Sequence, residues 1–444
     1  MVGRSVQRRH DGSNTISCLE RRDSHVLRRG ARRACESEPP LKHKRPGRLT
    51  LLGRPLRSES FRRLWFAQAT SELGDWAGRI ALSVLVFERT DSALLAASVT
   101  TVSLLPYVGI GPILTGWTSK FPRRRVLVTC DLLRAAAFAS MSLGLPVWML
   151  LLLAFVAGTA TPPFEATRSA ALPSVTDPDT YGEALKLTSI TAETALFAGY
   201  LLGGALLAVA GASTALLLDA ITFLVSAALL ATVVPEHLGG AATQTKFRDG
   251  WGAAFGDPVV RRYVIVFTIC AGCAMCGEAL APALVADDLD GQPSLVGVLA
   301  ALVSVGVILS AALLPRRRSD VGRVQLGVAV ALIGSLGAAC GFALGWDLPW
   351  IAVPYLCLGI TFASRIPGNE VMGTRIPDIH RAAAFSVALG ALALGQAATP
   401  FLAGLIARES SPRAALVAVS VVSVVTASVA TLRPVREPSP SARS

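Results

Sequence analysis

Apolar stretches long enough to cross a membrane recur along this chain from Leu64 to Leu432. A helix of about 20 residues spans the hydrocarbon core, which is about 30 Å thick. Hydrophobic residues make up 52% of the 444 residues and charged residues only 16%, whereas a soluble domain has about 25% charged residues. Such a chain cannot cover itself with polar surface, and its apolar runs are too long for the strands of a membrane barrel. We therefore predict an all-α membrane protein.

The apolar stretches predict twelve transmembrane helices. Most of the loops between them are short, and a short loop forces neighbouring helices to run antiparallel and close together, so the helices should pack as bundles. The expected spans are 64–87, 93–117, 126–143, 146–166, 184–211, 214–234, 263–285, 294–315, 324–344, 349–372, 381–408 and 412–432.

The 42 Lys and Arg residues are divided unevenly between the two alternating sets of loops. One set holds only Arg89, Arg408 and Arg413. Because cytoplasmic loops near the membrane carry the excess of positive charge, the richer set should be cytoplasmic. With an even number of spans both termini should then be cytoplasmic, and we expect a multi-pass protein of the cell (plasma or inner) membrane.

The first 60 residues are strongly basic, with 15 Lys and Arg against six Asp and Glu. The formal net charge of +12 is therefore largely local. Since this segment has no apolar run of signal-peptide length, we expect a disordered cytoplasmic tail near anionic lipids rather than a leader, a span or a nucleic-acid-binding segment. A start codon assigned too early in the gene is the alternative.

The two halves of the chain contain similar motifs at corresponding positions. The Pro163–Pro173 segment follows the fourth expected span, and the Pro367–Pro377 segment, with the same spacing between its prolines, follows the tenth. Arginine triplets follow the second and the eighth spans, at 123–125 and 316–318. Transporters are often built from internal repeats, so these similarities predict two six-helix bundles.

An amphipathic segment should connect the two bundles. Phe247, Trp251, Phe255 and Val259 are spaced four apart, so on a helix they form one apolar stripe that would lie on the cytoplasmic membrane surface. The expected domains are a tail at 1–60, a bundle at 61–234, a linker at 235–262, a bundle at 263–432 and a tail at 433–444.

Short motifs follow one another between Phe61 and Leu432, namely Phe61–Trp65, Leu73–Trp76, Gly111-Pro112, Arg123–Leu127, Asp131–Arg134, Phe164–Pro173, Leu218-Asp219 and Gly250-Trp251. In their order and spacing they resemble the major facilitator superfamily, and within it the drug and siderophore (enterobactin) exporter-like group. The resemblance implies two six-helix bundles that rock about a central cavity and export a small molecule at the expense of a proton gradient.

Two positions depart from the pattern of that family. Its signature loop between the second and third spans has an acid that helps to latch one conformation, whereas this chain has Ser119. Its antiporters have a proline in the fifth span, whereas this chain has Tyr200. The glycine spacing of that span is kept at Gly199, Gly203 and Gly204, which should allow close helix packing.

Ionisable residues within the spans are candidates for function, because each costs several kcal/mol to insert. In the first span Glu72, Asp75 and Arg79 lie on one helical face. If Arg79 pairs with Asp75, protonation of the carboxylate would release the pair, as in a pH-dependent switch. A permanently closed pair that serves only architecture is an equally good interpretation.

The other charges within the spans each allow two interpretations. Glu193 and Glu278 have no opposite charge within a turn of their own helices, so each could carry a proton or bind a cationic substrate, or could be paired across helices. Asp219 is expected near the start of the sixth span, where a helix N-terminus favours an acid, so it has either a structural or a transport role. Arg365 could face the cavity, although we favour its extension toward the cytoplasmic surface.

A further group should form the cytoplasmic gate. Asp131 and Arg134, expected near the start of the third span, have the i, i+3 spacing of an intrahelical pair, with substrate contact as the alternative. Glu165 and Arg168 have the same spacing at the end of the fourth span. The expected gate residues of the first half are Ser119, Arg123, Arg124, Arg125, Asp131, Arg134, Glu165 and Arg168, and Glu370 belongs to the second half.

Enzyme and cofactor signatures are absent from the sequence. There is no GxxxxGK[ST] phosphate loop and no GxSxG elbow, so we expect neither an enzyme nor an ATP-driven pump. The five His lie outside the spans, and Cys270, Cys273 and Cys276 are better explained as small packing residues than as ligands. We therefore expect no metal and no other cofactor.

These observations together favour a secondary active transporter that exports a small molecule (a drug, secondary metabolite or siderophore) in exchange for protons. Asp75, Glu193 and Glu278 are the leading candidates for carrying protons or binding substrate charge. We expect a monomer whose partners are its small-molecule substrate, protons and membrane lipids, with no nucleic acid. An uptake symporter is one alternative, and a transporter-like sensor or scaffold is another, favoured by the missing acid at Ser119.

Overall fold

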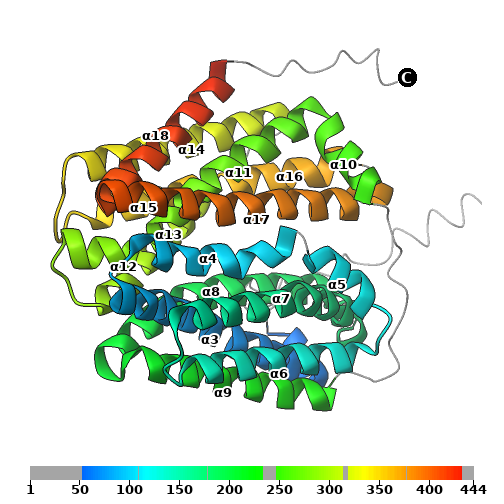
Figure 1. Cartoon of the computed structure of the whole chain (residues 1–444). Helices are drawn as coiled ribbons and strands as arrows, with labels where there is room; N and C mark the ends of the chain where they lie inside the picture. Colours follow the sequence, from blue (N-terminus) through cyan, green and yellow to red (C-terminus); the bar gives the residue numbers. More distant parts are fainter. Residues whose placement is uncertain are drawn as a thin grey trace, which may run out of the picture. The chain divides into compact units, whose positions relative to one another are not determined.

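The regular structure of the chain is helical throughout the residues that the computed structural model describes, which are 53–432 without 109, 178, 234–246, 314–318 and 377 (Figure 1). The helices of the first half are η1 (Pro55–Arg57), α3 (Glu59–Thr90), α4 (Ala93–Val108), α5 (Ile110–Thr118), α6 (Arg123–Met141), α7 (Val147–Val175), α8 (Tyr181–Val209) and α9 (Gly211–Val233). Those of the second half are α10 (Phe247–Gly256), α11 (Pro258–Ala279), α12 (Ala281–Ala283), η2 (Leu284–Asp288), α13 (Ser294–Leu313), α14 (Asp320–Ala343), α15 (Ala352–Ala363), α16 (Arg365–Arg375), α17 (Asp378–Glu409) and α18 (Pro412–Leu432).

Eight helices within the described residues are long and apolar enough to cross a membrane, namely α7, α8, α9, α11, α13, α14, the Val387–Glu409 part of α17, and α18. The other four expected spans also correspond to helices. Two of them, α3 and α6, carry ion pairs in their interiors. The span expected at 349–372 is divided into α15 and α16, and the one expected at 93–117 corresponds to α4 and α5, between which residue 109 is not described. The fold is that of an all-α membrane protein, consistent with twelve spans.

The helices form two bundles, which Figure 1 shows one below the other. In the first bundle α3 packs on α8 and α9, and α6 packs on α7 and α9. In the second bundle α14 packs on α15 and α18, and α11 packs on α17. The two bundles meet where α4 packs on α17 and where α8 packs on α13.

Helix boundaries follow local capping chemistry. Asp257 accepts hydrogen bonds from the backbone N–H groups of Val259 and Val260, and Pro258 occupies the first turn, where its missing N–H is harmless. Consequently α11 begins at 258, five residues before the expected span. The short helix expected in the linker is present as α10, but residues 234–246 lie outside the described part of the chain.

The ends of the chain also lie mostly outside the described residues. Of the expected tail at 1–60 only the last eight residues are described. Their end belongs to the first bundle, because α3 begins at Glu59. Ser58 caps this helix by accepting a hydrogen bond from the Phe61 N–H. Arg54 also forms an ion pair with Glu183 of α8 at 3.3 Å. The tail at 433–444 is not described.

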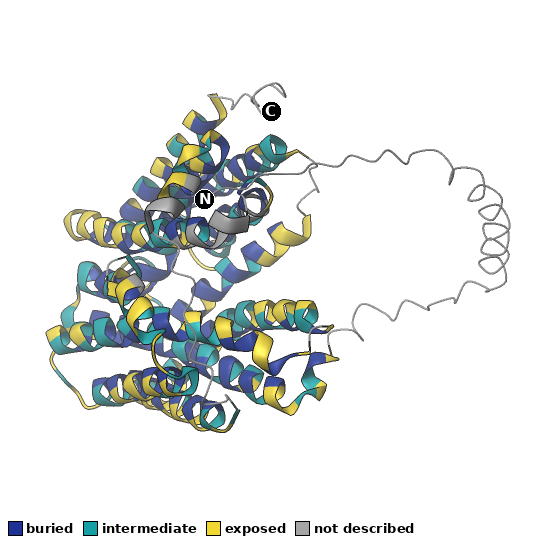
Figure 2. Cartoon of the chain, turned by 90° about the vertical axis from the view of Figure 1, so that its right-hand side faces the viewer, coloured by how far each residue is buried: buried dark blue, intermediate teal, exposed yellow. Residues whose placement is uncertain are grey.

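Many residues on the outward-facing helices of both bundles are exposed, as Figure 2 shows in yellow. On α9 and α18 most of the exposed side chains are aliphatic, including Leu217, Leu218, Ile221, Leu224, Val421, Val422, Val425 and Val429. A soluble protein does not expose so much contiguous apolar surface, so these faces fit contact with lipid.

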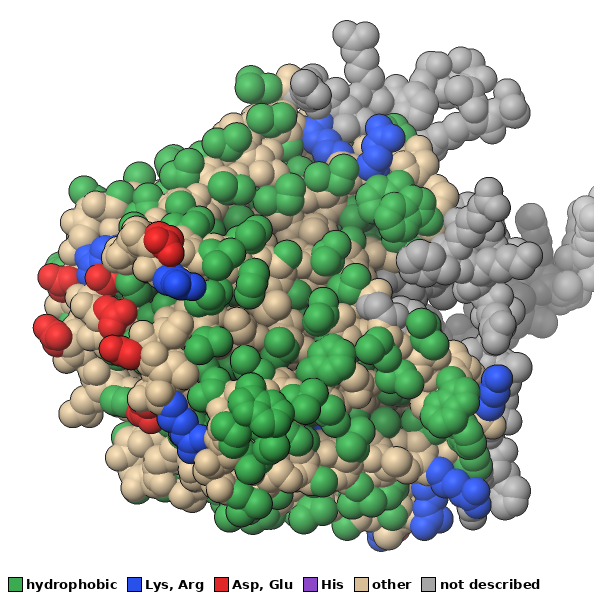
Figure 3. Space-filling view, viewed as in Figure 1, with side chains coloured by type: hydrophobic (Ala, Val, Ile, Leu, Met, Phe, Trp, Pro, Cys, Tyr) green, Lys and Arg blue, Asp and Glu red, His purple; other side chains and the backbone are tan. Residues whose placement is uncertain are grey.

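The two ends of the bundles carry opposite charge, as Figure 3 shows. We call one the acid-rich end, because the turns and the short helix η2 there hold Asp91, Asp287, Asp288, Asp290 and Asp347. Partial burial, with the nearby Asp91 and Asp288, raises the pKa of Asp287 above its usual value. We call the opposite end base-rich, because helices begin there with Arg123, Arg124, Arg125, Arg261, Arg262 and Arg323.

Glycines let the helices of the second bundle approach closely. A Cβ atom at Gly306 of α13 would lie 2.1 Å from the Leu356 carbonyl oxygen, and one at Gly359 of α15 would lie 2.0 Å from the Val303 carbonyl oxygen. No side chain fits between α13 and α15 at this level. The backbones are therefore in direct contact, as at small-residue contacts between membrane helices.

We expect Gly306→Leu to destabilise the protein by about 1–3 kcal/mol, because the new side chain must push α13 away from α15. Gly390→Leu is the matched control, since Gly390 lies in α17 with nothing within 4 Å of the position of its Cβ. Thermal unfolding of the purified protein in detergent measures both. Equal unfolding temperatures for the two variants would contradict the packing described here.

Candidate functional site

Two buried side chains from different bundles are joined by a hydrogen bond. The Tyr200 hydroxyl of α8 donates to the Glu278 carboxylate of α11, and the two residues are only 4% and 8% exposed. The Trp76 ring of α3 packs edge to face on the Tyr200 ring, with 5.4 Å between the ring centroids. The Arg79 guanidinium lies 4.5 Å from the centroid of the Trp76 ring. These four residues and Asp75, which pairs with Arg79, form what we call the central cluster.

Asp75 and Arg79 form the ion pair that their spacing predicts, at 3.1 Å along α3. Both side chains are largely buried, at 22% and 14% exposed. Both charges act electrostatically on Glu278, so the first bundle presents one cation and one anion to the carboxylate of the second. The pair is closed in this structure.

A second polar contact between the bundles joins Glu193 of α8 to Arg365 of α16 as an ion pair. Arg365 also lies over the ring of Phe362, 4.7 Å from its centroid, and its carbonyl accepts a hydrogen bond from the Tyr263 hydroxyl at 3.2 Å. The prediction that Arg365 extends toward the cytoplasmic surface is therefore wrong. Its guanidinium group is paired with the Glu193 carboxylate across the interface. Glu193 agrees with the second interpretation given for it from the sequence, because it is paired with a residue on another helix.

Glu72 and Glu165 extend the polar interface along the first bundle. Arg168 of α7 pairs with Glu72 of α3 at 2.9 Å, whereas Glu165 accepts a hydrogen bond from the Tyr107 hydroxyl at 3.4 Å. Glu165 and Arg168, which have the same i, i+3 spacing as Asp131 and Arg134, thus have different partners. Glu165 is exposed, whereas Glu72 is largely buried. Because an unpaired buried charge is costly, pairing with Arg168 stabilises Glu72 more than it would stabilise Glu165.

Asp131 and Arg134 form their expected pair, but it lies in the middle of α6 rather than near its start. Asp131 is fully buried and accepts a second hydrogen bond from the Ser226 hydroxyl at 2.7 Å. Arg134 is held between the rings of Phe164 and Phe223, at 4.2 and 4.5 Å from their centroids. The pair therefore ties α6 to α7 and α9 inside the first bundle, not at a gate on its surface.

A cavity of about 20 Å³ connects this buried pair to the central cluster. That is room for a single water molecule, provided that polar groups surround it. Its polar lining comes from Asp75, Arg79, Ser103, Arg134 and Thr161. Asp75 and Arg79 of one ion pair and Arg134 of the other thus border the same small cavity.

Asp219 is explained by packing and not by a helix N-terminus. It is the ninth residue of α9, which begins at Gly211, so the dipole argument for it was wrong. Its carboxylate is 1% exposed and accepts a hydrogen bond from the Thr222 hydroxyl at 3.2 Å. The carboxylate oxygens lie 2.5 and 2.4 Å from where a Cβ atom would stand at Gly74 and Gly78 of α3. These two glycines make the space that Asp219 fills.

The remaining expected residues are spread over the first bundle. Ser119 lies in the turn after α5, where its hydroxyl donates to the Gly116 carbonyl at 2.8 Å, and Arg123, Arg124 and Arg125 are the first residues of α6. Gly199 and Gly203 lie against Trp76 and Ala77 of α3. Gly204 instead faces the other bundle, against Gly297 of α13. The Glu370 side chain is outside the described part of the structure.

Sequence reasoning missed the roles of Tyr200 and Trp76. It noted Tyr200 only as a departure from a family pattern and gave Trp76 no role. The available signal was chemical, since a residue with a large ring and a polar tip within an apolar span needs a partner for its hydroxyl when buried.

The polar groups along the interface of the bundles do not balance in charge. Among the side chains that the structure describes, five carboxylates (Glu72, Asp75, Glu165, Glu193 and Glu278) accompany three guanidinium groups (Arg79, Arg168 and Arg365). If all are ionised, two negative charges are in excess. Protons or a cationic group could neutralise that excess, and an anion could not.

Comparisons with known proteins agree with this architecture. The model of a family described as "Transmembrane secretion effector" matches residues 52–442. The "Uncharacterized MFS-type transporter YfiS" of Bacillus subtilis (strain 168) is 22% identical over 355 residues, covering 77% of this chain and 82% of that protein. "Macrolide efflux protein A" of Streptococcus pyogenes is 26% identical over 106 residues, covering 23% of this chain and 26% of that protein.

Solved structures share the fold. The nucleoside transporter NupG has a TM-score of 0.68 at 13% identity, with 84% of this chain and 98% of that chain covered. The POT family transporter PepTSo has a TM-score of 0.67 at 13% identity, with 84% and 97% covered. At such identities the similarity concerns the fold alone.

We expect Arg134→Met to destabilise the protein by about 3–5 kcal/mol, because it leaves the fully buried Asp131 carboxylate without its cation. The exposed pair of Glu59 and Arg63 supplies the control, and Arg63→Met should cost less than about 1 kcal/mol. Thermal unfolding in detergent measures both. The double variant Asp131→Asn/Arg134→Met should recover part of the loss, and an Arg134→Met protein as stable as Arg63→Met would refute the assignment.

Proposed function

We propose that this chain, which belongs to the transmembrane secretion effector family of the major facilitator superfamily, is a proton-coupled exporter of a small molecule. That it is a membrane transporter of this superfamily follows from the family itself. The finer proposal depends on one observation, the excess of carboxylates over guanidinium groups at the interface between the bundles.

Proton coupling would arise from the contacts that cross the interface. Alternating access requires the bundles to separate at one end, which breaks contacts such as those of Glu193 with Arg365 and of Tyr200 with Glu278. A carboxylate that loses its partner within the membrane is costly unless it takes up a proton. Proton uptake at Glu193 or Glu278 would therefore accompany the change of conformation, while Asp75 would exchange Arg79 for a proton or a substrate cation.

The charges at the two ends support an orientation for the proposed exporter. The base-rich end would face the cytoplasm, because positive residues near the membrane are retained there. The acid-rich end would then face outward, and both termini would be cytoplasmic. We accordingly propose a multi-pass protein of the cell membrane.

Two observations support export and suggest a class of substrate. The family description refers to secretion, and part of the chain is similar to a macrolide efflux protein. The negative excess at the interface favours a neutral or cationic drug or secondary metabolite over an anionic siderophore.

A sensor that no longer transports is the second candidate. Its support is Ser119, which stands where the family has a latching acid and whose hydroxyl bonds within its own turn, to the Gly116 carbonyl. A protein that cannot latch its conformations would transport poorly.

Proteoliposomes that contain a pH-sensitive dye distinguish these functions. We expect a substrate among a panel of cationic and neutral drugs to drive proton movement in the opposite direction. Asp75→Asn, Glu193→Gln and Glu278→Gln should each strongly reduce that movement, because an amide cannot take up the proton that the carboxylate would carry. Glu59→Gln is the control, since Glu59 is an exposed carboxylate at the end of α3.

The other outcomes of the proteoliposome assay identify the alternative functions. Movement of substrate and protons in the same direction would identify a symporter. Substrate movement without protons would refute the coupling, and a protein that moves neither across the panel would be better described as a sensor.

A further inference from the structure

We propose that Tyr200 is a positioning residue whose hydrogen bond to Glu278 holds the acid-rich ends of the two bundles together. The inference goes beyond the proposed function, because it applies to any substrate and to either direction of transport. The hydrogen bond would determine which end of the two bundles is closed when no substrate is bound.

Tyr200 touches both bundles through different parts of the residue. Its hydroxyl donates to Glu278 of α11. Its carbonyl oxygen lies 2.3 Å from where a Cβ atom would stand at Gly297 of α13. Its ring packs on Trp76 of its own bundle, over which Arg79 lies. The residue therefore connects two helices of the second bundle to the charged face of α3.

The contacts on the acid-rich side of Tyr200 are close. A Cβ atom at Gly204, one turn further along α8, would lie 2.6 Å from the Ser294 carbonyl oxygen of α13. At the other crossing, a Cβ atom at Gly404 of α17 would lie 2.9 Å from the Leu94 Cα atom of α4. The Thr101 hydroxyl donates across this crossing to the Ala397 carbonyl at 2.8 Å. The acid-rich end is thus closed in this structure.

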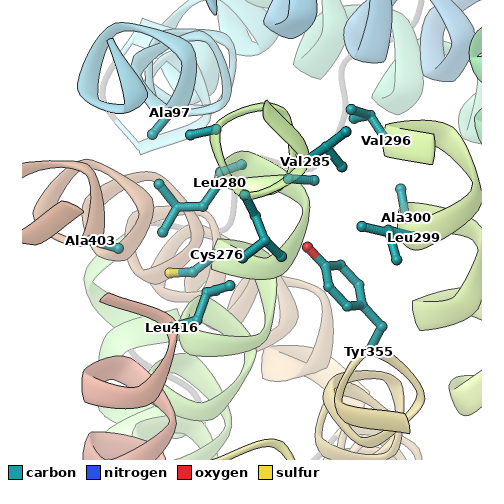
Figure 4. Packing of buried hydrophobic residues seen from close by; sticks show 14 of the residues in the cluster. Ala97, Cys276, Leu280, Val285, Val296, Leu299, Ala300, Tyr355, Ala403 and Leu416 are labelled. Carbon is teal, nitrogen blue, oxygen red and sulfur yellow. The ribbon is translucent and has the colours of Figure 1, made fainter. Parts of the chain in front are cut away.

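Apolar side chains fill the space beside these crossings. Figure 4 shows Ala97 of α4 and Ala403 of α17 in the same cluster as Leu280 and Leu416. Apolar contacts stabilise the closed end but have no direction, so they would allow the helices to slide. A hydrogen bond has direction, and the bond from Tyr200 to Glu278 can therefore fix the position of α8 on the second bundle.

Opening the acid-rich end would separate α8 from α11 and α13. Glu278 would then lose the hydroxyl that Tyr200 donates, and a buried acceptor left without a donor is costly. Tyr355 of α15 does not replace it, because its hydroxyl donates to the Gly277 carbonyl at 3.0 Å. The bond from Tyr200 thus opposes opening at this end and not at the other.

The helix itself fits this role. The proline found here in the antiporters that this chain resembles would have no N–H and would interrupt the helical hydrogen bonds. In this chain α8 runs unbroken from Tyr181 to Val209, and the residue at position 200 supplies a donor.

Pulsed electron paramagnetic resonance between two spin labels tests the proposal on the full chain in lipid nanodiscs, with no substrate present. The labels replace Leu143, in the turn after α6, and Leu344, at the end of α14, which are 76% and 66% exposed at the acid-rich ends of different bundles. The background carries serine at the cysteines that are not buried in the described structure, Cys340 and Cys357, and at Cys18 and Cys35.

Tyr200→Phe should raise the population with a long distance between the labels about tenfold, which corresponds to about 1.4 kcal/mol. Tyr355→Phe is the matched control. It also removes a buried hydroxyl that bonds next to Glu278, but both partners of that bond lie within the second bundle. We expect its distance distribution to match that of the unsubstituted protein.

Two further variants keep the test decisive if Tyr200→Phe does not fold. Glu278→Leu removes the acceptor and should produce the same shift, whereas Glu278→Gln keeps an oxygen that can accept the bond and should shift less. No shift in either Tyr200→Phe or Glu278→Leu, or an equal shift in Tyr355→Phe, would overturn the proposal. Since no substrate or proton gradient is used, failure of the exporter assay leaves this result unaffected.

Discussion

Every charge within a membrane-spanning helix needs a partner inside the protein, because an unpaired charge in hydrocarbon costs several kcal/mol. Four of the carboxylates within the described spans meet this requirement, in two ways. Asp131 with Arg134, and Glu72 with Arg168, are paired within the first bundle. Glu193 is paired with Arg365 across the interface, and Glu278 takes its donor from Tyr200 there.

Contacts within one bundle and contacts across the interface respond differently when the bundles move. Pairs inside one bundle persist when the bundles move, and together with the backbone contacts at Gly306 and Gly359 they make each bundle a unit. Pairs across the interface have to break when the bundles separate. In the proposed mechanism the groups that lose partners are then Glu193 and Glu278, which would become accessible to protons or substrate.

Much of the fold could be predicted from the sequence, since the length of an apolar stretch and the bias of Lys and Arg depend on the sequence alone. Pairs along one helix were also predictable, because the spacing of Asp75 and Arg79 fixes their distance. Partners on different helices were not. The pairing of Arg168 with Glu72, and of Arg365 with Glu193, depends on which helices are neighbours and on how each is rotated, and a single sequence does not contain that information.

The central claim is that two rigid bundles rock about the interface that these contacts form. Spin labels at the acid-rich end, at Leu143 and Leu344, and at the base-rich end, at the exposed Phe121 and Arg261, measure this in the unsubstituted protein. The account predicts that, across a range of pH values and candidate substrates, the two distances change in opposite directions. Distances that both stay fixed, or that lengthen and shorten together, would contradict it.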